Sequence, residues 1–393
     1  MIGSVASGNQ ESAPPREPSF GGRGEWLVPA LLAALVLAIV TVRVSRQYRP
    51  LTYLVGDCPY YAATAASLIE DHDLDLRNQL QGGLEVHGPQ IALGRNGAWY
   101  PKHPLLMPFA ALPLVMAFGI PGTLLFNVLV VGALAVVLQR LARPVATPWA
   151  AGAASLLLIF GTFLRRYDYN FSPDLFATLV LTTAWLALQR GRDRQGGLLL
   201  GLAATAKLTH LFLLPFGLAY AAWCRRGRGL ARAAGAAAAP LAALALLNAA
   251  LFGSPFVTSY DRNVIFDHGR PIVVSHRGLF DGSPLQGLEG ELFDPVHGLV
   301  PTSPMLLLAL PGVLILLQRR PREAVLFIAV GEFLLLFFST YRYWSLSHYG
   351  NRFLMPLVAV ASPPVALTLD RMAAGARSWL AKRHAPAALQ RPA

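Results

Sequence analysis

Long apolar runs alternate with short polar segments along the chain from Trp26 to Leu369. A helix needs about 20 apolar residues to cross the hydrocarbon core of a bilayer, so the shorter runs must borrow flanking residues. The pattern predicts an all-α polytopic membrane protein. Its apolar runs are Trp26–Val44, Leu105–Phe118, Leu124–Leu138, Trp149–Phe163, Leu175–Leu188, Gly197–Trp223, Ala233–Phe252, Met305–Leu317, Ala324–Phe338 and Phe353–Leu369.

Arginine-rich segments between these runs predict their orientation, because Lys and Arg are enriched in cytoplasmic loops. All these arginine-rich segments can lie on the cytoplasmic side only under two conditions. First, Leu105–Phe118 lies on the outer surface, or dips into it, and makes one net crossing together with the next helix. Second, Gly197–Trp223 must be two short spans broken around Thr209-His210. This gives about ten crossings with both termini cytoplasmic. The expected cytoplasmic residues are Arg140, Arg143, Arg190, Arg192, Arg194, Arg225, Arg226, Arg228, Arg232, Arg319, Arg320, Arg322, Arg371, Arg377, Lys382 and Arg383, whereas Arg43, Arg46 and Arg49 fall outside, against the rule.

The same pattern divides the chain into one membrane domain and two tails. Residues 1–24 are rich in Gly, Ser, Pro and Glu, a composition typical of disorder, and predict a cytoplasmic tail. Residues 25–371 form the transmembrane domain. Residues 45–104 are its first outer loop, and residues 253–302 are a second large outer loop that we expect to carry juxtamembrane helices. Residues 372–393 are the expected cytoplasmic C-terminal tail.

Composition and charge support a membrane protein rather than a nucleic-acid-binding one. Mean hydropathy is +0.46 and 14% of residues are charged, against about a quarter in soluble domains. The net charge of +12 comes from arginines in short runs between apolar segments, so the positive-inside bias explains it better than nucleic acid does. Cys58 and Cys224 are expected on opposite membrane faces, which excludes a disulfide between them.

The first outer loop carries acidic and basic groups at its two ends. Asp57 follows Gly56 and precedes a helix-like run from Pro59, which fits a helix N-cap. The alternative is a general base, or a ligand to a divalent cation, at the lipid interface. Lys102-His103 follows two aromatic residues that favour the headgroup region. A Lys ammonium there could hold a lipid phosphate or simply anchor the loop.

Further polar residues interrupt or border the later apolar runs. Asp174 opens a run at the outer face, where N-capping is again the alternative. Lys207 and His210 lie inside an apolar run, and burying a charge there is costly, so a paired or inward-facing role is favoured. The last outer turn includes His348 and Arg352 among aromatic residues, which suits sugar stacking and phosphate binding nearly as well as an aromatic belt. His72 lies among carboxylates whose spacing matches no strong metal-ligand pattern.

In this order, the motifs resemble the GT-C superfamily of membrane glycosyltransferases, which includes polyprenyl-phosphate-sugar-dependent mannosyltransferases and aminoarabinose transferases. No single motif is specific; the series covers most of the chain from Trp26 to Leu369. The segments that carry the resemblance are Gly56-Asp57-x-Pro59-x-Tyr61, Ser67 to Leu76, Trp99-Tyr100-Pro101-Lys102-His103-Pro104, Pro173-Asp174-Leu175, Gly201-Leu202-Ala203-Ala204-x-x-Lys207, Gly253-Ser254-Pro255-Phe256 and Tyr349-Gly350-Asn351-Arg352-Phe353-Leu354-x-Pro356.

The resemblance implies a GT-C-like helical bundle in the bacterial inner membrane. It implies inverting transfer of a sugar from a polyprenyl-phosphate donor to an envelope glycan, lipid or protein at the outer face. Asp57 is then similar to the catalytic base and Asp174 to a second outer-face carboxylate. Lys102, His103 and Arg352 would hold the donor phosphate. Tyr61, Lys207, His210 and His348 are further expected substrate-binding residues.

One departure from the family pattern bears on the cofactor. Many relatives carry Glu directly after the Asp and His two residues later, where this chain has Cys58 and Tyr60. The cofactor is therefore left open, with Mg²⁺ or Mn²⁺ at Asp57 as one alternative. Two rival functions also stay open. One is a transporter or flippase of a lipid-linked sugar, and the other is a catalytically inactive relative.

Overall fold

The computed structural model describes residues 26–48, 54, 56–81, 90–267, 270–275, 278–346 and 350–383. Helices dominate this part of the chain, and each predicted apolar run overlaps at least one of them. The α-helices are α1 Leu27–Gln47, α2 Cys58–Glu70, α3 Arg77–Gln81, α4 Leu106–Phe118, α5 Pro121–Ala142, α6 Pro148–Phe160, α7 Pro173–Gln189, α8 Asp193–Ala206, α9 Leu214–Phe252, α10 Pro284–Phe293, α11 Leu299–Thr302, α12 Ala309–Arg319, α13 Pro321–Ser339, α14 Met355–Val360 and α15 Ser362–Arg383. Short 3₁₀ helices are η2 Phe163–Arg166, η3 Leu208–Leu213, η4 Ser259–Arg262, η5 Pro304–Leu308 and η6 Arg352–Leu354.

Proline sets the start of several long helices. Pro121, Pro148, Pro173 and Pro321 each stand at the first position of α5, α6, α7 and α13. Their fixed φ suits that position, and the N–H that proline lacks would be unpaired there in any case. The polar turns between apolar runs therefore pass directly into these four helices, whose predicted bounds lie within a few residues of those observed, whereas α15 continues well past the predicted end at Leu369.

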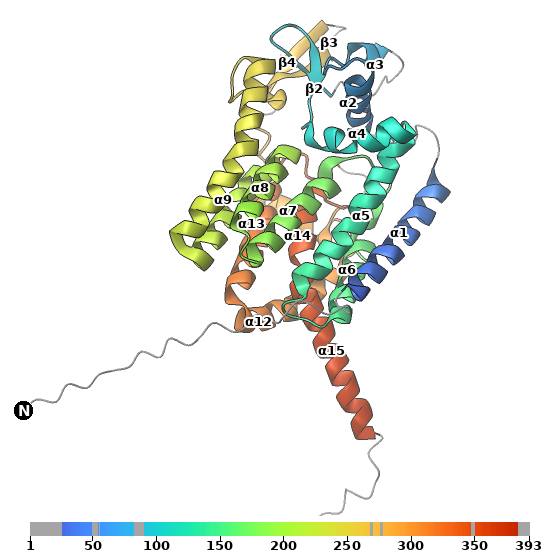
Figure 1. Ribbon diagram of the computed structural model, residues 1–393, viewed down its shortest axis with the longest axis vertical. Helices are drawn as coiled ribbons and strands as arrows, with labels where there is room; N and C mark the ends of the chain where they lie inside the picture. Colours follow the sequence, from blue (N-terminus) through green and yellow to red (C-terminus); the bar gives the residue numbers. More distant parts are fainter. Residues whose placement is uncertain are drawn as a thin grey trace, which may run out of the picture.

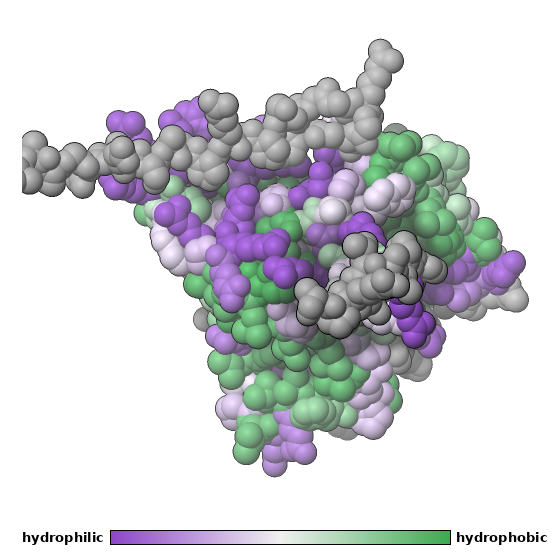
Figure 2. Space-filling model, turned by 90° about the horizontal axis from the view of Figure 1, so that it is seen from below, coloured by the Kyte–Doolittle hydropathy of each residue, from purple (hydrophilic) through white to green (hydrophobic). Residues whose placement is uncertain are grey.

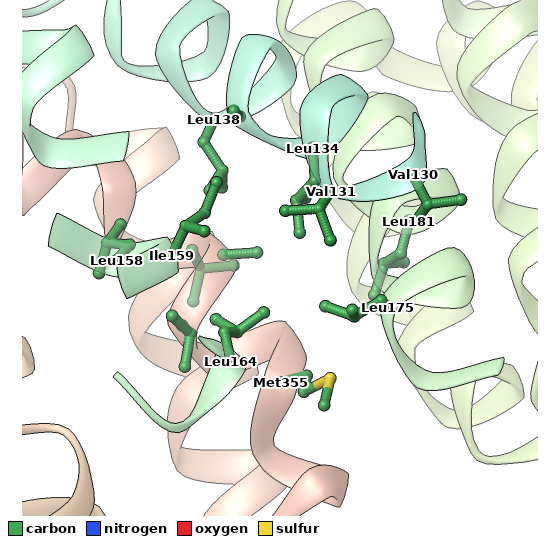
Figure 3. Close-up of a cluster of buried hydrophobic side chains, with 14 of the residues drawn as sticks. Val130, Val131, Leu134, Leu138, Leu158, Ile159, Leu164, Leu175, Leu181 and Met355 are labelled. Atoms are coloured by element: carbon green, nitrogen blue, oxygen red, sulfur yellow. The ribbon is translucent and has the colours of Figure 1, made fainter. Parts of the chain in front are cut away.

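The centre of the bundle is a close-packed apolar core built by α5, α6, α7 and α14. Figure 3 shows Val131 and Leu134 of α5 facing side chains from the other helices. Lipid is as apolar as these side chains, so packing rather than transfer from water holds such a bundle together. The labelled core residues are Val130, Val131, Leu134, Leu138, Leu158, Ile159, Leu164, Leu175, Leu181 and Met355.

The break expected near Thr209-His210 is confirmed. Helix α8 ends at Ala206, Lys207 adopts an extended conformation, and η3 follows before α9 begins. Helix α9 reverses at Arg225 and Arg226, whose φ and ψ are not helical. A Cβ on Gly229 would lie 2.5 Å from the carbonyl oxygen of Ala221, so the two halves of α9 form a tight hairpin. The chain therefore passes along the bundle three times between Asp193 and Phe252.

A four-stranded antiparallel sheet caps one end of the bundle, beside α2, α3 and α4 (Figure 1). The strands are β1 Ile91–Leu93, β2 Trp99–Pro101, β3 Asn263–Asp267 and β4 Arg270–Val274, in the order β2-β1-β3-β4. Strand β1 pairs with β3 through Ala92 and Asn263, so the sheet joins the two segments predicted as outer loops, residues 45–104 and 253–302. The sequence pattern did not predict these strands.

Arginine-rich turns gather at the opposite end of the bundle. Arg225 Nε donates to Asp193 Oδ1 at 2.6 Å, which joins the α9 hairpin to the start of α8. Arg140 lies over the ring of Trp26 at 4.4 Å, which joins the end of α5 to the start of α1. Seen from this end, hydrophilic side chains gather across the middle of the molecule, and hydrophobic ones cover much of its flanks (Figure 2).

Three described helices are long and apolar enough to cross a membrane by length and composition, or four if a bent pair counts as one span. They are Leu27–Gln47, Pro121–Ala142 and Leu208–Phe252, and the last of these contains η3 and both halves of the α9 hairpin. The bent pair is Arg352–Val360 with Ser362–Ala381. The other apolar helices are shorter, so the number of ten crossings stays a prediction. Helix α4 is one of the short ones and lies beside the sheet (Figure 1). Its expected place at the outer surface stays a prediction.

The two predicted tails differ in what the structure describes. Residues 1–24 lie outside the described residues. Residues 372–383 continue α15, which projects beyond the bundle at the end opposite the sheet (Figure 1).

Candidate active site

Asp57 stands at the N-cap position of α2, but its side chain makes no capping hydrogen bond. It turns instead toward the end of the chain, where its Oδ2 accepts a hydrogen bond from Arg352 Nη1 at 2.9 Å. Gly56, with φ at +61°, makes the turn that precedes it. Asp57 therefore occupies the N-cap position as predicted, while its carboxylate binds Arg352 instead of capping the helix.

Arg352 bridges the two expected catalytic carboxylates. Its Nη1 lies 2.9 Å from Asp57 Oδ2 and 4.0 Å from Asp174 Oδ2. Asp174, in the first turn of α7, also accepts from Lys207 Nζ at 2.5 Å and from Ser172 Oγ at 3.0 Å. Two carboxylates and two cations thus alternate in one cluster, which offsets part of the cost of burying each charge.

Lys102 and His103 enter the cluster directly after β2, so the sheet positions them. The Nζ of Lys102 donates to Gln90 Oε1 at 2.6 Å, and its backbone carbonyl accepts from Ser259 Oγ at 2.6 Å. His103 stacks against Tyr61, with ring centroids 5.1 Å apart. Its Nε2 lies 3.6 Å from Asp57 Oδ1.

The charge states of these groups differ from the sequence-based expectation. Burial lowers the pKa of His103 to about 4, although Asp57 opposes that shift. The imidazole is therefore neutral at pH 7 and cannot hold a phosphate by charge. Burial also lowers the pKa of Lys102, to about 8, against the effect of Asp57. Burial raises the pKa of Asp57, but His103, Arg352 and Lys102 together outweigh burial, so the net shift of that pKa is downward.

Lys207 and His210 border the same cluster, at the break between α8 and η3. The ammonium of Lys207 lies 4.9 Å from the centre of the Phe353 ring, a cation–π contact beside its ion pair with Asp174. His210 is buried, and its backbone N donates to Lys207 O at 2.8 Å. The break between α8 and η3 places both residues here, because an unbroken helix would carry them past the cluster.

Cys58 and Tyr60, the two positions that depart from the family pattern, have structural contacts. Cys58 is buried, and its thiol donates to Asn170 Oδ1, which ties α2 to the turn before α7. Tyr60 packs beneath the sheet with Leu76, Ile91 and Val264. Both residues therefore support the loops that carry Asp57 and Asp174.

The arrangement around Asp57 does not fit a divalent cation. Among the described residues, no group of three or more His, Cys, Asp and Glu side chains could hold a metal ion. The guanidinium of Arg352 lies between the two carboxylates, where a bridging cation would have to bind. Hard cations need several oxygen ligands, and Asp57 has cationic neighbours instead.

The structure gathers most of the predicted site residues and adds one that the sequence did not single out. Tyr260 is half-buried in the predicted second outer loop, with its hydroxyl 3.4 Å from His103 Nδ1 and its ring 5.9 Å from Lys102 Nζ. His348 lies outside the described residues. The residues brought together are Asp57, Tyr61, Lys102, His103, Asp174, Lys207, His210 and Arg352.

Two solved structures have a similar fold. The crystal structure of ArnT from Cupriavidus metallidurans bound to undecaprenyl phosphate matches with a TM-score of 0.59 and 16% identity, covering 92% of this chain and 62% of that one. The archaeal oligosaccharyltransferase AglB from Archaeoglobus fulgidus, in complex with an inhibitory peptide and a dolichol-phosphate, matches with a TM-score of 0.60 and 14% identity, covering 94% and 53%. The chain thus spans less than two thirds of either. The predicted GT-C fold is confirmed.

A comparison with curated proteins finds no match. Residues 103–363 match the sequence profile of glycosyltransferase family 87. The match begins at His103 and includes Asp174, Lys207 and Arg352, and it covers more than half of the 393 residues. The fold is therefore that of the GT-C membrane glycosyltransferases, and the chain belongs to glycosyltransferase family 87.

Proposed function

We propose that the protein transfers a sugar from a polyprenyl-phosphate donor to a cell-envelope acceptor at the outer face of the inner membrane, with both termini cytoplasmic. The observation that carries this proposal is the alternating cluster of Asp57, Arg352, Asp174 and Lys207 with Lys102 beside it. A lipid-linked phosphate needs cations at membrane depth, and the acceptor needs a base next to them. The structures of ArnT with undecaprenyl phosphate and AglB with a dolichol-phosphate support a donor of this class.

The proposed reaction uses the cluster in two ways. The acceptor hydroxyl forms a bond to the anomeric carbon as the bond from that carbon to the phosphate oxygen breaks, with inversion. Arg352 and Lys102 neutralise the charge that develops on the leaving polyprenyl phosphate. Asp57 takes the proton of the acceptor hydroxyl. The acceptor is a hydroxyl of an envelope glycan or lipid, or a protein side chain.

Arg352 lies where Asp57 and a donor phosphate would compete for it, which explains its position at the centre of the cluster. In the free enzyme, Arg352 holds the pKa of Asp57 down, so the carboxylate is a weak base. A donor phosphate that binds Arg352 competes with Asp57 for the same guanidinium. As the interaction between Arg352 and Asp57 weakens, the pKa of Asp57 rises. Donor binding therefore prepares the base, and proton abstraction follows donor binding.

The test is release of polyprenyl phosphate by the purified full-length protein from polyprenyl-phosphate sugars. We expect Asp57→Asn to lower the rate by at least about 100-fold, the usual contribution of a general base. Glu70→Gln, an exposed carboxylate at the far end of α2, is the matched control and should keep the wild-type rate. An Asp57→Asn enzyme with normal turnover would refute the assignment of the base.

A transporter or flippase is the second candidate, because the ion pair of Lys207 with Asp174 lies at the membrane end of the cluster. The same assay separates the two functions. A transporter moves its lipid intact, whereas a transferase releases free polyprenyl phosphate. Binding of the donor without either result would instead indicate an inactive relative.

A further inference from the structure

Glu291 is a fully buried carboxyl group in the second outer loop. It lies near the end of α10 and is 0% exposed. Its Oε1 accepts a hydrogen bond from Asn351 Nδ2 at 2.9 Å, and Asn351 is also 0% exposed. Its Oε2 is buried without a hydrogen-bond partner among the described residues. A buried acid with one free oxygen is costly to keep, so its position calls for a role.

Helix α10 and the residues around it hold the segment that leads to Arg352. Gly287 packs so closely that a Cβ there would lie 1.8 Å from the carbonyl oxygen of Ser339. A Cβ on Gly290 would lie 2.3 Å from the Trp344 ring. Backbone bonds extend the contact: Gly282 N to Thr340 O at 2.9 Å, Arg342 N to Leu279 O at 2.8 Å, and Gly350 N to Val296 O at 2.8 Å.

Asn351 connects this contact to the active site. Its Oδ1 accepts from Phe353 N at 3.0 Å and so caps η6, whose first residue is Arg352. Arg352 in turn donates to Asp57 at 2.9 Å. One amide side chain therefore contacts Glu291 through its nitrogen and fixes the backbone beside Arg352 through its oxygen.

The surroundings keep Glu291 neutral. Burial raises its pKa to about 9, with the Asn351 amide acting in the opposite direction. The nearest titratable groups along the chain after α10 are Asp294 and His297, which pair with each other at 3.0 Å. Glu289, on the same helix, is exposed. An ionised Glu291 would leave a buried charge without a countercharge, and opening of the contact between α10 and residues 339–352 would relieve it.

We propose that Glu291 is a positioning residue for glycosyl transfer, whose neutral acid holds Asn351 and thereby fixes Arg352 between the two carboxylates. The inference rests on the proposed function for its effect on turnover, but not for its effect on the local structure. It links the second outer loop, through α10, to Arg352, whose guanidinium lies beside both Asp57 and Asp174.

Three variants of the full-length protein test this role. Glu291→Gln keeps the shape and the acceptor oxygen without a charge, so turnover at pH 7 stays within about threefold of the wild type. Glu291→Ala leaves Asn351 unpaired and Arg352 misplaced, and kcat falls by about 10- to 100-fold. Glu289→Ala on the exposed face of α10 is the control. Equal loss in Glu291→Gln and Glu291→Ala would overturn the proposal, because a positioning role requires rescue by the isosteric amide.

Amide hydrogen exchange of residues 350–354 gives a readout that does not depend on any donor. In Glu291→Ala, these amides should exchange at least about tenfold faster than in the wild type, because the lost hydrogen bond is worth about 1–3 kcal/mol. As pH rises through about 9, where Glu291 ionises, these amides should exchange faster in the wild type than in Glu291→Gln at the same pH. Identical exchange in all three proteins would overturn the proposal. Faster exchange in Glu291→Ala, with no wild-type turnover, would leave the positioning intact and count against the glycosyl-transfer assignment.

Discussion

Lys102 is a cation of the site whose charge changes near physiological pH. Burial lowers its pKa to about 8; Arg352 adds to this shift and Asp57 opposes it. The ammonium is fully present below that pH and is lost above it. Lys102 can therefore hold an anionic headgroup at pH 7, while half of it is neutral near pH 8. Bound phosphate would itself favour the charged form.

We predict that affinity for polyprenyl phosphate falls as pH rises from 7 to 9.5, with a midpoint near pH 8 in the free enzyme. Lys102→Arg should abolish this fall in affinity, because a guanidinium keeps its proton throughout this pH range. Isothermal titration with short-chain polyprenyl phosphate at fixed ionic strength measures the effect. Affinity that stays constant across this range in the wild type would show that Lys102 does not carry the headgroup.

The ionisable residues of the site were predictable because charges beside apolar runs are rare and expensive. Asp57, Lys102, Asp174 and Arg352 all stand at such boundaries, and all contribute to the cluster. Tyr260 and Glu291 were not predictable in this way. Both lie in a Gly- and Pro-rich loop without periodicity, and their places depend on pairing between distant segments, Ala92 with Asn263 and Glu291 with Asn351.

At the scale of elements, one ion pair ties α1 to the turn between η2 and α7. Arg43 Nε donates to Asp168 Oδ2 at 2.8 Å, and its Nη2 donates to Arg165 O at 2.9 Å. From α5, Asn127 Nδ2 donates to the carbonyl oxygens of Tyr167 and Asp168. The predicted topology places Arg43 on the outer side, against the positive-inside rule, and its ion pair accounts for that position. Its partner is a nearly buried carboxylate, so its position follows from pairing.

We predict that Arg43→Ala destabilises the protein by about 3 kcal/mol or more, because it leaves Asp168 buried without its cation. Arg46→Ala, an exposed arginine one turn further along α1, should change stability by less than about 0.5 kcal/mol. Thermal unfolding in detergent, followed at several heating rates, compares the two. Equal unfolding midpoints for both variants would contradict the structural role of the pair.

At the scale of the molecule, the sheet and α10 join the outer loops into one cap. The sheet aligns Lys102 and His103 with Tyr260, and α10 aligns Arg352 with Asp57. Helix α7 and the break after α8 bring Asp174 and Lys207 to the same place. The side chains of the cluster therefore come from six separate stretches of chain, and helix packing alone would not bring them together.

This arrangement makes the orientation in the membrane testable. The sheet end must face outward if the acceptor is a cell-envelope molecule, and the arginine-rich end must then face the cytoplasm. Leu285 of α10 and Met372 of α15 are both well exposed, at 77% and 59%. Helix α10 packs against Ser339 at the end of α13 that leads to Arg352, whereas α15 projects at the end opposite the sheet (Figure 1). In a Cys224→Ser background, with Cys58 buried, a membrane-impermeant maleimide should label Leu285→Cys in cells whose outer membrane alone is opened. Met372→Cys should react only after the inner membrane is also permeabilised, and the reverse result would place the site on the cytoplasmic side.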